Sequence, residues 1–84
     1  MSYLYNHIAT ATTTTITASQ GILHSIVVNT SDNGAITVSD ANGTIAILKK
    51  EVVEGTFLYD VSFNGYLEII TANTTDITVT YNVT

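Results

Sequence analysis

The sequence contains no cysteine, no proline and no tryptophan, and its only basic residues are Lys49 and Lys50. The lack of cysteine excludes disulfide scaffolds, cysteine zinc sites and thiol catalysis. Two basic residues are too few for nucleic acid or anionic lipid as a partner, because neutralising phosphates requires several lysines or arginines on one face. With seven acidic residues the formal net charge is −5. A chain of 84 residues is predicted to form one small domain.

Long hydrophobic segments are also missing. No stretch approaches the roughly 18 apolar residues of a membrane helix, and the first residues lack the positive region of a secretory signal, so we expect no membrane partner and no export. Charged residues make up only 11% of the chain, against about 25% in an average soluble domain. This indicates a coat of uncharged Thr and Asn, coverage in an assembly, or both. Because small domains without disulfides often rely on association, we expect a homo-oligomer.

The residues present in excess are β-branched: 16 Thr, 10 Ile and 8 Val make up 34 of the 84 positions. Such side chains suit a pleated, half-buried surface, and turn signals recur every eight to twelve residues. The sequence therefore predicts an all-β fold, a single small antiparallel β-sandwich of about seven strands, with jelly-roll and immunoglobulin-like arrangements both open. The predicted strands are residues 11–18, 22–29, 35–40, 44–50, 56–63, 66–71 and 76–83.

Alternation within these segments predicts which side chains face the core. The clearest period of two lies in 76–83, and 56–63 is expected to supply an aromatic centre for the core with Phe57, Tyr59, Val61 and Phe63. In 44–50 we expect Ile45 and Ile47 to face inward and Leu48 to lie opposite. Segment 22–29 is apolar on both faces and is predicted to be a central strand. One face of it holds Ile22, His24, Ile26 and Val28, and the other holds Leu23 and Val27.

Two Asn-Gly signals predict hairpins. Asn33-Gly34 is expected to join 22–29 to 35–40, and Asn42-Gly43 to join 35–40 to 44–50. Residues 44–54 also fit a short helix, since Ile45, Leu48 and Val52 have helical spacing, but the β-branched content favours the strand.

Residues 1–8 do not join the strand pattern and are predicted to form an N-terminal arm that precedes a sandwich domain over residues 9–84. The arm is unusually apolar for a terminus. Packing on a neighbouring subunit or partner and packing back on its own sandwich are both open. The candidate subunit or capsid contacts are Tyr3, Leu4, Tyr5, His7 and Ile8.

Few side chains offer chemistry, so we expect no catalytic residues, no metal, no cofactor and no enzymatic activity. His24 is interpreted as a structural or interface histidine. Asp60 lies mid-strand among apolar residues and is expected to pair with Lys49 or Lys50, with a backbone amide and a partner subunit as alternatives. Asp40 opens a segment that superficially matches a calcium loop, but the sixth position, which requires Gly, is Ile45.

Three segments, 21–29, 55–65 and 76–81, together resemble the small Thr-rich β-sandwich structural proteins of tailed bacteriophages. That group includes capsid decoration or cement proteins, which typically sit as trimers on the head. The resemblance implies a virion protein on the capsid surface, assembled in the host cytoplasm, with itself and the major capsid protein as partners. The alternative is a carbohydrate- or host-binding β-sandwich module of a phage fibre, for which Tyr3, Tyr5 and Tyr66 are the candidate aromatic platforms.

Overall fold

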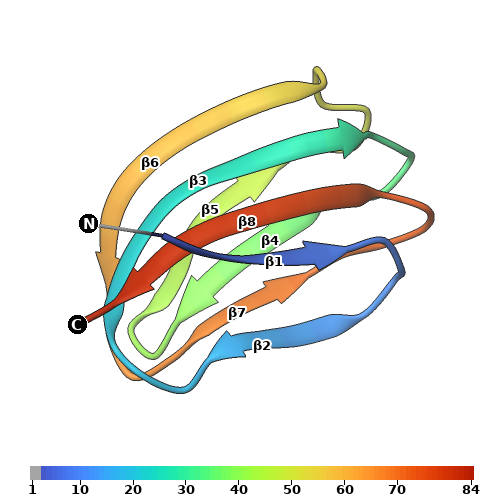
Figure 1. The fold of residues 1–84 in the computed structure, drawn as a ribbon. Coiled ribbons are helices and arrows are strands. Elements are labelled where there is room, and N and C mark those ends of the chain that lie inside the picture. The colour runs from blue at the N-terminus through green and yellow to red at the C-terminus, as the bar shows by residue number, and fades with distance from the viewer. Residues whose placement is uncertain (1–2) are drawn as a thin grey trace.

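A computed structural model describes residues 3–84, which form two four-stranded antiparallel sheets packed face to face (Figure 1). The strands are β1 (Leu4–Ile8), β2 (Thr13–Thr17), β3 (Gly21–Thr30), β4 (Ile36–Asp40), β5 (Gly43–Leu48), β6 (Gly55–Phe63), β7 (Leu67–Ile70) and β8 (Asp76–Val83). The first sheet has the order β1-β8-β3-β6 and the second has the order β2-β7-β4-β5. Residues 3–84 include no helix that could cross a membrane. The predicted all-β sandwich is confirmed, with eight strands in place of about seven.

The strand order distinguishes between the two arrangements left open by the sequence. In an immunoglobulin fold the first two strands are neighbours in one sheet. Here β1 and β2 lie in different sheets, and every later step along the chain also changes sheet except the step from β4 to β5. Eight strands wound between two sheets in this order form a jelly roll.

The core between the sheets is mainly aliphatic. In β8, Ile77 and Val79 are fully buried and Tyr81 is nearly so, as the alternation predicts. The predicted aromatic centre in β6 is wrong, because only Phe63 at its end is fully buried. The other inward side chains of β6 are half-buried, since β6 is an edge strand with a neighbour on one side only.

The predicted facing of β3 is wrong beyond its first residues, although β3 is a central strand as expected. A β-bulge lies between Leu23 and Ser25, where β3 has one more residue than β8. An extra residue reverses the inward and outward alternation that follows it. Leu23, Ile26 and Val28 therefore share the core, and His24 lies on the outer face.

In β5 the predicted facing is wrong for Ile47 and Leu48, whereas Ile45 packs against the core as expected. Leu48 is opposite Ile36 of β4 and is buried, whereas Ile47 is 59% exposed. Directly opposed residues of an antiparallel pair share a face, so the fully buried Ile36 draws Leu48 into the core. Residues 43–48 form a strand, and the helix considered for 44–54 is not formed.

The hairpin predicted between 22–29 and 35–40 is wrong, because β3 and β4 belong to different sheets. Gly34 in their connection serves close packing, since a Cβ placed there would lie 2.5 Å from the Cβ of Ala72. The second predicted hairpin is confirmed: β4 and β5 pair antiparallel, with Gly43 at a positive φ of 134° in the turn.

Most of the predicted N-terminal arm is an edge strand of the first sheet. β1 pairs along its whole length with β8, from Leu4 opposite Tyr81 to Ile8 opposite Ile77. This strand is the additional, eighth one, and it corresponds to the alternative in which the segment packs on its own sandwich. Met1 and Ser2, which open the predicted arm, lie outside the described residues.

Candidate interaction surface

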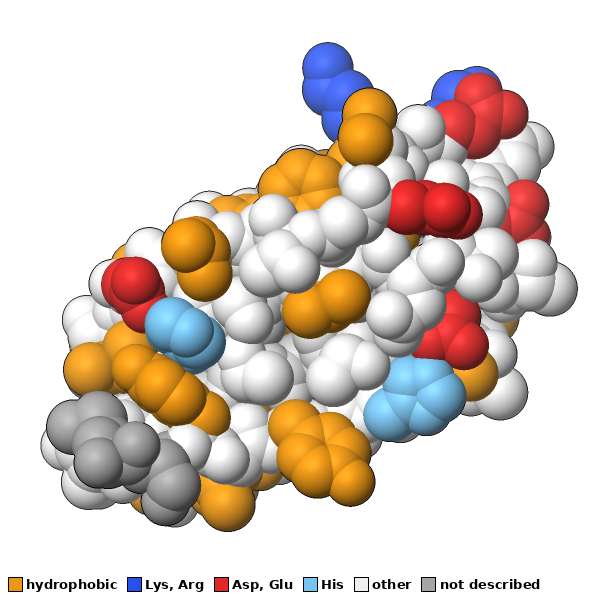
Figure 2. All heavy atoms as spheres, turned by 45° about the horizontal axis from the view of Figure 1, so that its top comes forward, with side chains coloured by type: hydrophobic (Ala, Val, Ile, Leu, Met, Phe, Trp, Pro, Cys, Tyr) orange, Lys and Arg blue, Asp and Glu red, His pale blue; other side chains and the backbone are white. Residues whose placement is uncertain are grey.

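The outer face of the first sheet carries both histidines of the chain, each beside an aspartate (Figure 2). We call this surface the histidine face; it is centred on His7, His24, Asp60 and Asp76. These two aspartates are the only Asp, Glu, Lys or Arg residues in the four strands β1, β3, β6 and β8. Within these four strands, no Asp, Glu, Lys or Arg side chain therefore lies on the face outside the two pairs.

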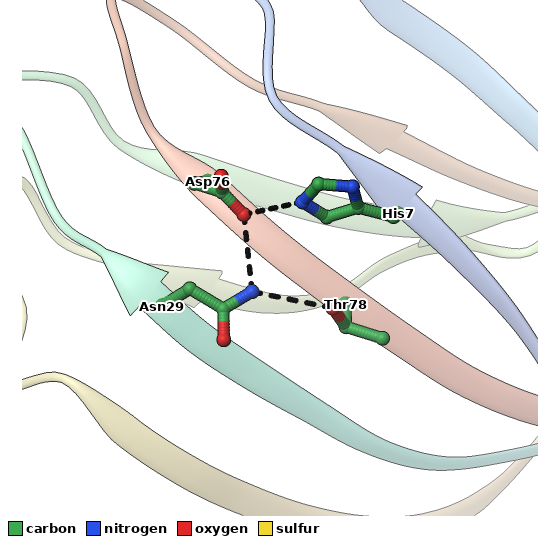
Figure 3. Close-up of polar contacts among 4 residues, drawn as sticks. All are labelled: His7, Asn29, Asp76 and Thr78. Atoms are coloured by element: carbon green, nitrogen blue, oxygen red, sulfur yellow. Dashed lines mark hydrogen bonds and ion pairs between the residues drawn. The ribbon is translucent and has the colours of Figure 1, made fainter.

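The first pair is part of a network that spans three strands (Figure 3). Nε2 of His7 on β1 lies 2.6 Å from Oδ1 of Asp76 on β8. The amide Nδ2 of Asn29 on β3 donates to the same Oδ1 at 3.0 Å and to Oγ1 of Thr78 at 3.2 Å. The hydrogen bond from Asn29, followed by that from His7, holds the pKa of Asp76 below its usual value of 3.8. Asp76 thus ties the edge strand β1 to the centre of the sheet.

The second pair, His24 with Asp60, lies at a β-bulge in the pairing of β3 with β6. Between Leu23 and Ser25, β3 has the single residue His24, and opposite it β6 has two residues. One of these, Asp60, has a positive φ of 48° and directs its carboxylate to the histidine. Nδ1 of His24 lies 2.6 Å from Oδ1 of Asp60. The ring of Tyr3 stacks on the face of this imidazole, with centroids 4.1 Å apart and an interplanar angle of 11°.

A row of side chains crosses the same face through all four strands. The strand registers place Tyr5 opposite Thr80, Thr80 opposite Ser25, and Ser25 opposite Leu58. In the middle, Oγ of Ser25 and Oγ1 of Thr80 are 2.5 Å apart and share a hydrogen bond. At the two ends, Tyr5 is 73% exposed and Leu58 is 68% exposed. The row therefore has a satisfied polar centre and an exposed apolar group at each end.

The predicted contact residues divide into an exposed group and a buried one. Tyr3, Tyr5 and His7 lie on the histidine face, and Leu4 is 52% exposed at the start of β1. Ile8 is 4% exposed and packs in the core of its own chain. The side chain of Ile8 is therefore not accessible for a subunit or capsid contact.

Asp60 does not pair with Lys49 or Lys50 as expected, but with His24. The contributions of Asp76 and Asn29 were not predicted. His7 and Asp76 are 69 positions apart in the sequence, and only the pairing of β1 with β8 brings them together. The one signal of this network in the sequence was Asp76, the acidic residue at the start of the last strand.

Within residues 3–84, no pocket is found and no group of three or more His, Cys, Asp or Glu side chains could hold a metal ion. The geometry therefore presents a surface and not a cleft. No family model matches the chain, and a comparison with curated proteins gave no match.

Proposed function

We propose that this chain is a virion structural protein, a capsid decoration protein that binds the outer head surface as a homotrimer and stabilises contacts between capsid subunits. The observation that carries the proposal is the row across the histidine face, with exposed Tyr5 and Leu58 on either side of the bonded Ser25 and Thr80. Apolar anchors around a satisfied polar centre are typical of protein interfaces.

The charge distribution supports contact with a protein surface. Asp60 and Asp76 each accept a hydrogen bond from a histidine of the same chain. A polar group that keeps its partner costs much less to remove from water than one that is left unpaired. When this face is buried against the major capsid protein, the favourable free energy of covering Tyr5 and Leu58 would therefore not be cancelled by the cost of removing the two aspartates from water.

In this proposal the protein acts through the sum of many modest contacts. A decoration protein that bridges two capsid subunits must be broken away from one of them before they separate. Its binding free energy thus adds to the work of opening the shell, and no chemical step is needed. The jelly roll suits this role because its closely packed core holds the outer face in one shape.

The direct test is co-sedimentation with expanded heads of the phage whose genome encodes the chain. We expect the protein to sediment with the heads and Tyr5→Asp to weaken binding by about ten-fold or more, as for a central interface residue. Ile70→Asp is the matched control, since Ile70 is an exposed apolar side chain on the second sheet. Absence of sedimentation with the wild-type chain would refute the proposal, and equal loss in both variants would remove the histidine face from it.

One observation favours a second candidate, a carbohydrate- or host-binding module of a phage fibre. Tyr5 is the most exposed aromatic residue among residues 3–84, and Tyr3 beside it is 44% exposed. Aromatic faces of this kind can stack on sugar rings. A glycan array probed with the wild-type chain and with Tyr5→Ala distinguishes the two: specific binding that is lost in the variant would favour the fibre module.

A further inference from the structure

The sandwich is covered unequally on its two sides. On one side the edge strands are β1 and β2, where Ile8 and Ile16 are 4% and 8% exposed and only Leu4, at the start of β1, is a large apolar inward residue with more than half of its surface exposed. On the other side the edge strands are β5 and β6 (Figure 1). There Leu48 and Phe63 are buried, but six further apolar residues that pack against the core are only partly buried: Ile45, Ala46, Val52, Phe57, Tyr59 and Val61. We call this the β5–β6 side, and the core is left partly open along it.

Exposed apolar groups gather at the margins of the same side. The most exposed large apolar side chain among residues 3–84, Val53 at 79%, lies in the connection between β5 and β6. Leu58 at 68% and Ile47 at 59% border this side from the outer faces of the first and second sheets. Figure 2, in which the top of Figure 1 is turned forward, shows apolar side chains along this upper edge. Exposed apolar groups beside a partly open core are candidates for a contact with another molecule.

Neither edge strand contains a lysine or a proline. Natural edge strands are commonly blunted by lysine, other inward-pointing charges or proline. β5 contains no charged residue and no proline, and the single charge of β6, Asp60, is turned toward His24 on the outer face. Both edges are therefore open to contact except where a β-bulge interrupts each strand, at Ile45 in β5 and at Tyr59 and Asp60 in β6.

We propose that the β5–β6 side is the surface through which copies of this chain associate with one another. The proposal deepens, and in that respect rests on, the homo-oligomer of the proposed function. It assigns subunit contacts to the β5–β6 side and leaves the histidine face for the capsid.

Charge favours a second copy as the occupant. Each copy has a formal charge of −5, so two copies repel one another unless their contact also brings opposite charges together. The connection between β5 and β6 is different, because it holds the only two lysines of the chain beside Glu51 and Glu54. A symmetry axis along the strands brings these connections together and allows lysines of one copy to face glutamates of the next.

The dimensions agree with a stable contact. The nine residues of β6 extend about 30 Å, and two stacked sheets with their side chains are roughly 20 Å across. The β5–β6 side therefore measures about 600 Å² in projection, and a rough surface has more accessible area than its projection. A standard protein interface buries about 800 Å² on each partner.

Adjacent residues of β6 provide a matched pair for the test. The side chain of Phe57 lies on the β5–β6 side, and that of Leu58 lies on the histidine face. In size exclusion with light scattering over a roughly hundred-fold dilution, the wild-type chain is expected to be oligomeric. Phe57→Lys is expected to raise the dissociation constant by about ten-fold or more, whereas Leu58→Lys leaves it within about two-fold. Circular dichroism establishes that both variants are folded.

Val53→Glu is a second test in case Phe57→Lys does not fold, because Val53 is 79% exposed and its substitution should not disturb the core. Val53 also lies between Glu51 and Glu54, so the variant adds a third negative charge to this connection. It is expected to weaken association at low salt and less so at high salt. A wild-type chain that is monomeric throughout, or an oligomer that all three variants leave intact, would overturn the proposal. Head binding by a monomeric chain would defeat this proposal and the homotrimer but not the capsid function, whereas a stable oligomer that does not bind phage heads would defeat only the capsid function.

Discussion

Single aspartates hold together the connections at both ends of the sandwich. Asp40 links two turns, because its Oδ2 accepts a hydrogen bond from the backbone N–H of Asn64 at 3.0 Å and its Oδ1 one from Asn42 at 2.9 Å. At the other end Asp32 accepts hydrogen bonds from the hydroxyl and the backbone N–H of Thr74. These bonds, from Asn64 and from Thr74 respectively, lower the pKa of each carboxyl group. Ionised carboxylates are thus part of the folded structure.

This arrangement predicts the response to acid. Asp32, Asp40 and Asp76 each have a pKa below 3.8 in the folded chain, so unfolding takes up protons. Their contribution is complete above the ordinary pKa and is lost as the pH falls through the folded values. We expect the free energy of unfolding, measured by urea titration, to decline steadily from about pH 5 to about pH 2. Asp32→Asn should make that decline shallower, and a stability that rises with acid would contradict this account.

Two phenylalanines of β6 give a prediction about packing. Phe63 is 1% exposed, whereas Phe57 is only partly buried at the open side. Phe63→Ala leaves a cavity in the core and is expected to cost about 3–5 kcal/mol of unfolding free energy. Phe57→Ala removes less contact and should cost about 1 kcal/mol in the dissociated chain. Urea denaturation at high dilution measures both, and equal costs would mean that the core is not closed where we describe it.

At the scale of the strands, two bulges meet at His24. His24 is an extra residue of β3 against β8, which reverses the facing of the rest of β3. Opposite His24, β6 has one more residue than β3, and there Asp60 lies on the outer face with a positive φ of 48°. Aspartate and asparagine accept this conformation more readily than other side chains, and β-branched residues resist it.

Substitution at Asp60 tests this account of the bulge. Asp60→Val is expected to lower the free energy of unfolding by about 1–2 kcal/mol, because a β-branched side chain is strained at this φ. Asp60→Asn keeps the backbone preference and should lie much closer to the wild-type protein. Thermal unfolding followed by circular dichroism compares the two, and a valine variant as stable as the asparagine variant would show that the bulge tolerates any residue.

The strands were predictable where local patterns define them. All seven predicted segments contain a strand, and the alternation in β8 gave the correct facing because nothing interrupts its period of two. The errors arose where pairing with distant strands determines the facing of a strand or the sheet to which it belongs. A bulge in β3, the register of β5 against β4 and the change of sheet between β3 and β4 are each set by neighbours distant in the sequence. The two His–Asp pairs were missed for the same reason.

For the whole molecule, the topology and the composition together predict the folding kinetics. Nearly all strand pairs of the jelly roll join distant parts of the chain, and such folds form in milliseconds to seconds. The sequence has no proline, so the slow isomerisation that takes about 10–100 s in many proteins has no X-Pro bond to act on. We expect refolding at low concentration, followed by stopped-flow circular dichroism, to finish without such a phase. A slow phase that is independent of protein concentration would contradict this.

The pairing of β1 with β8 also determines where the two ends of the chain meet. Leu4 at the start of β1 lies opposite Tyr81 near the end of β8, so both ends leave the same end of one sheet. The turn between β4 and β5, at Asn42 and Gly43, is exposed. A circular permutant can join the present ends through a short flexible linker and open the chain at this turn. It should retain every strand pairing and lose only the covalent connection between β4 and β5. The jelly roll could then carry cargo from either of two separate attachment points.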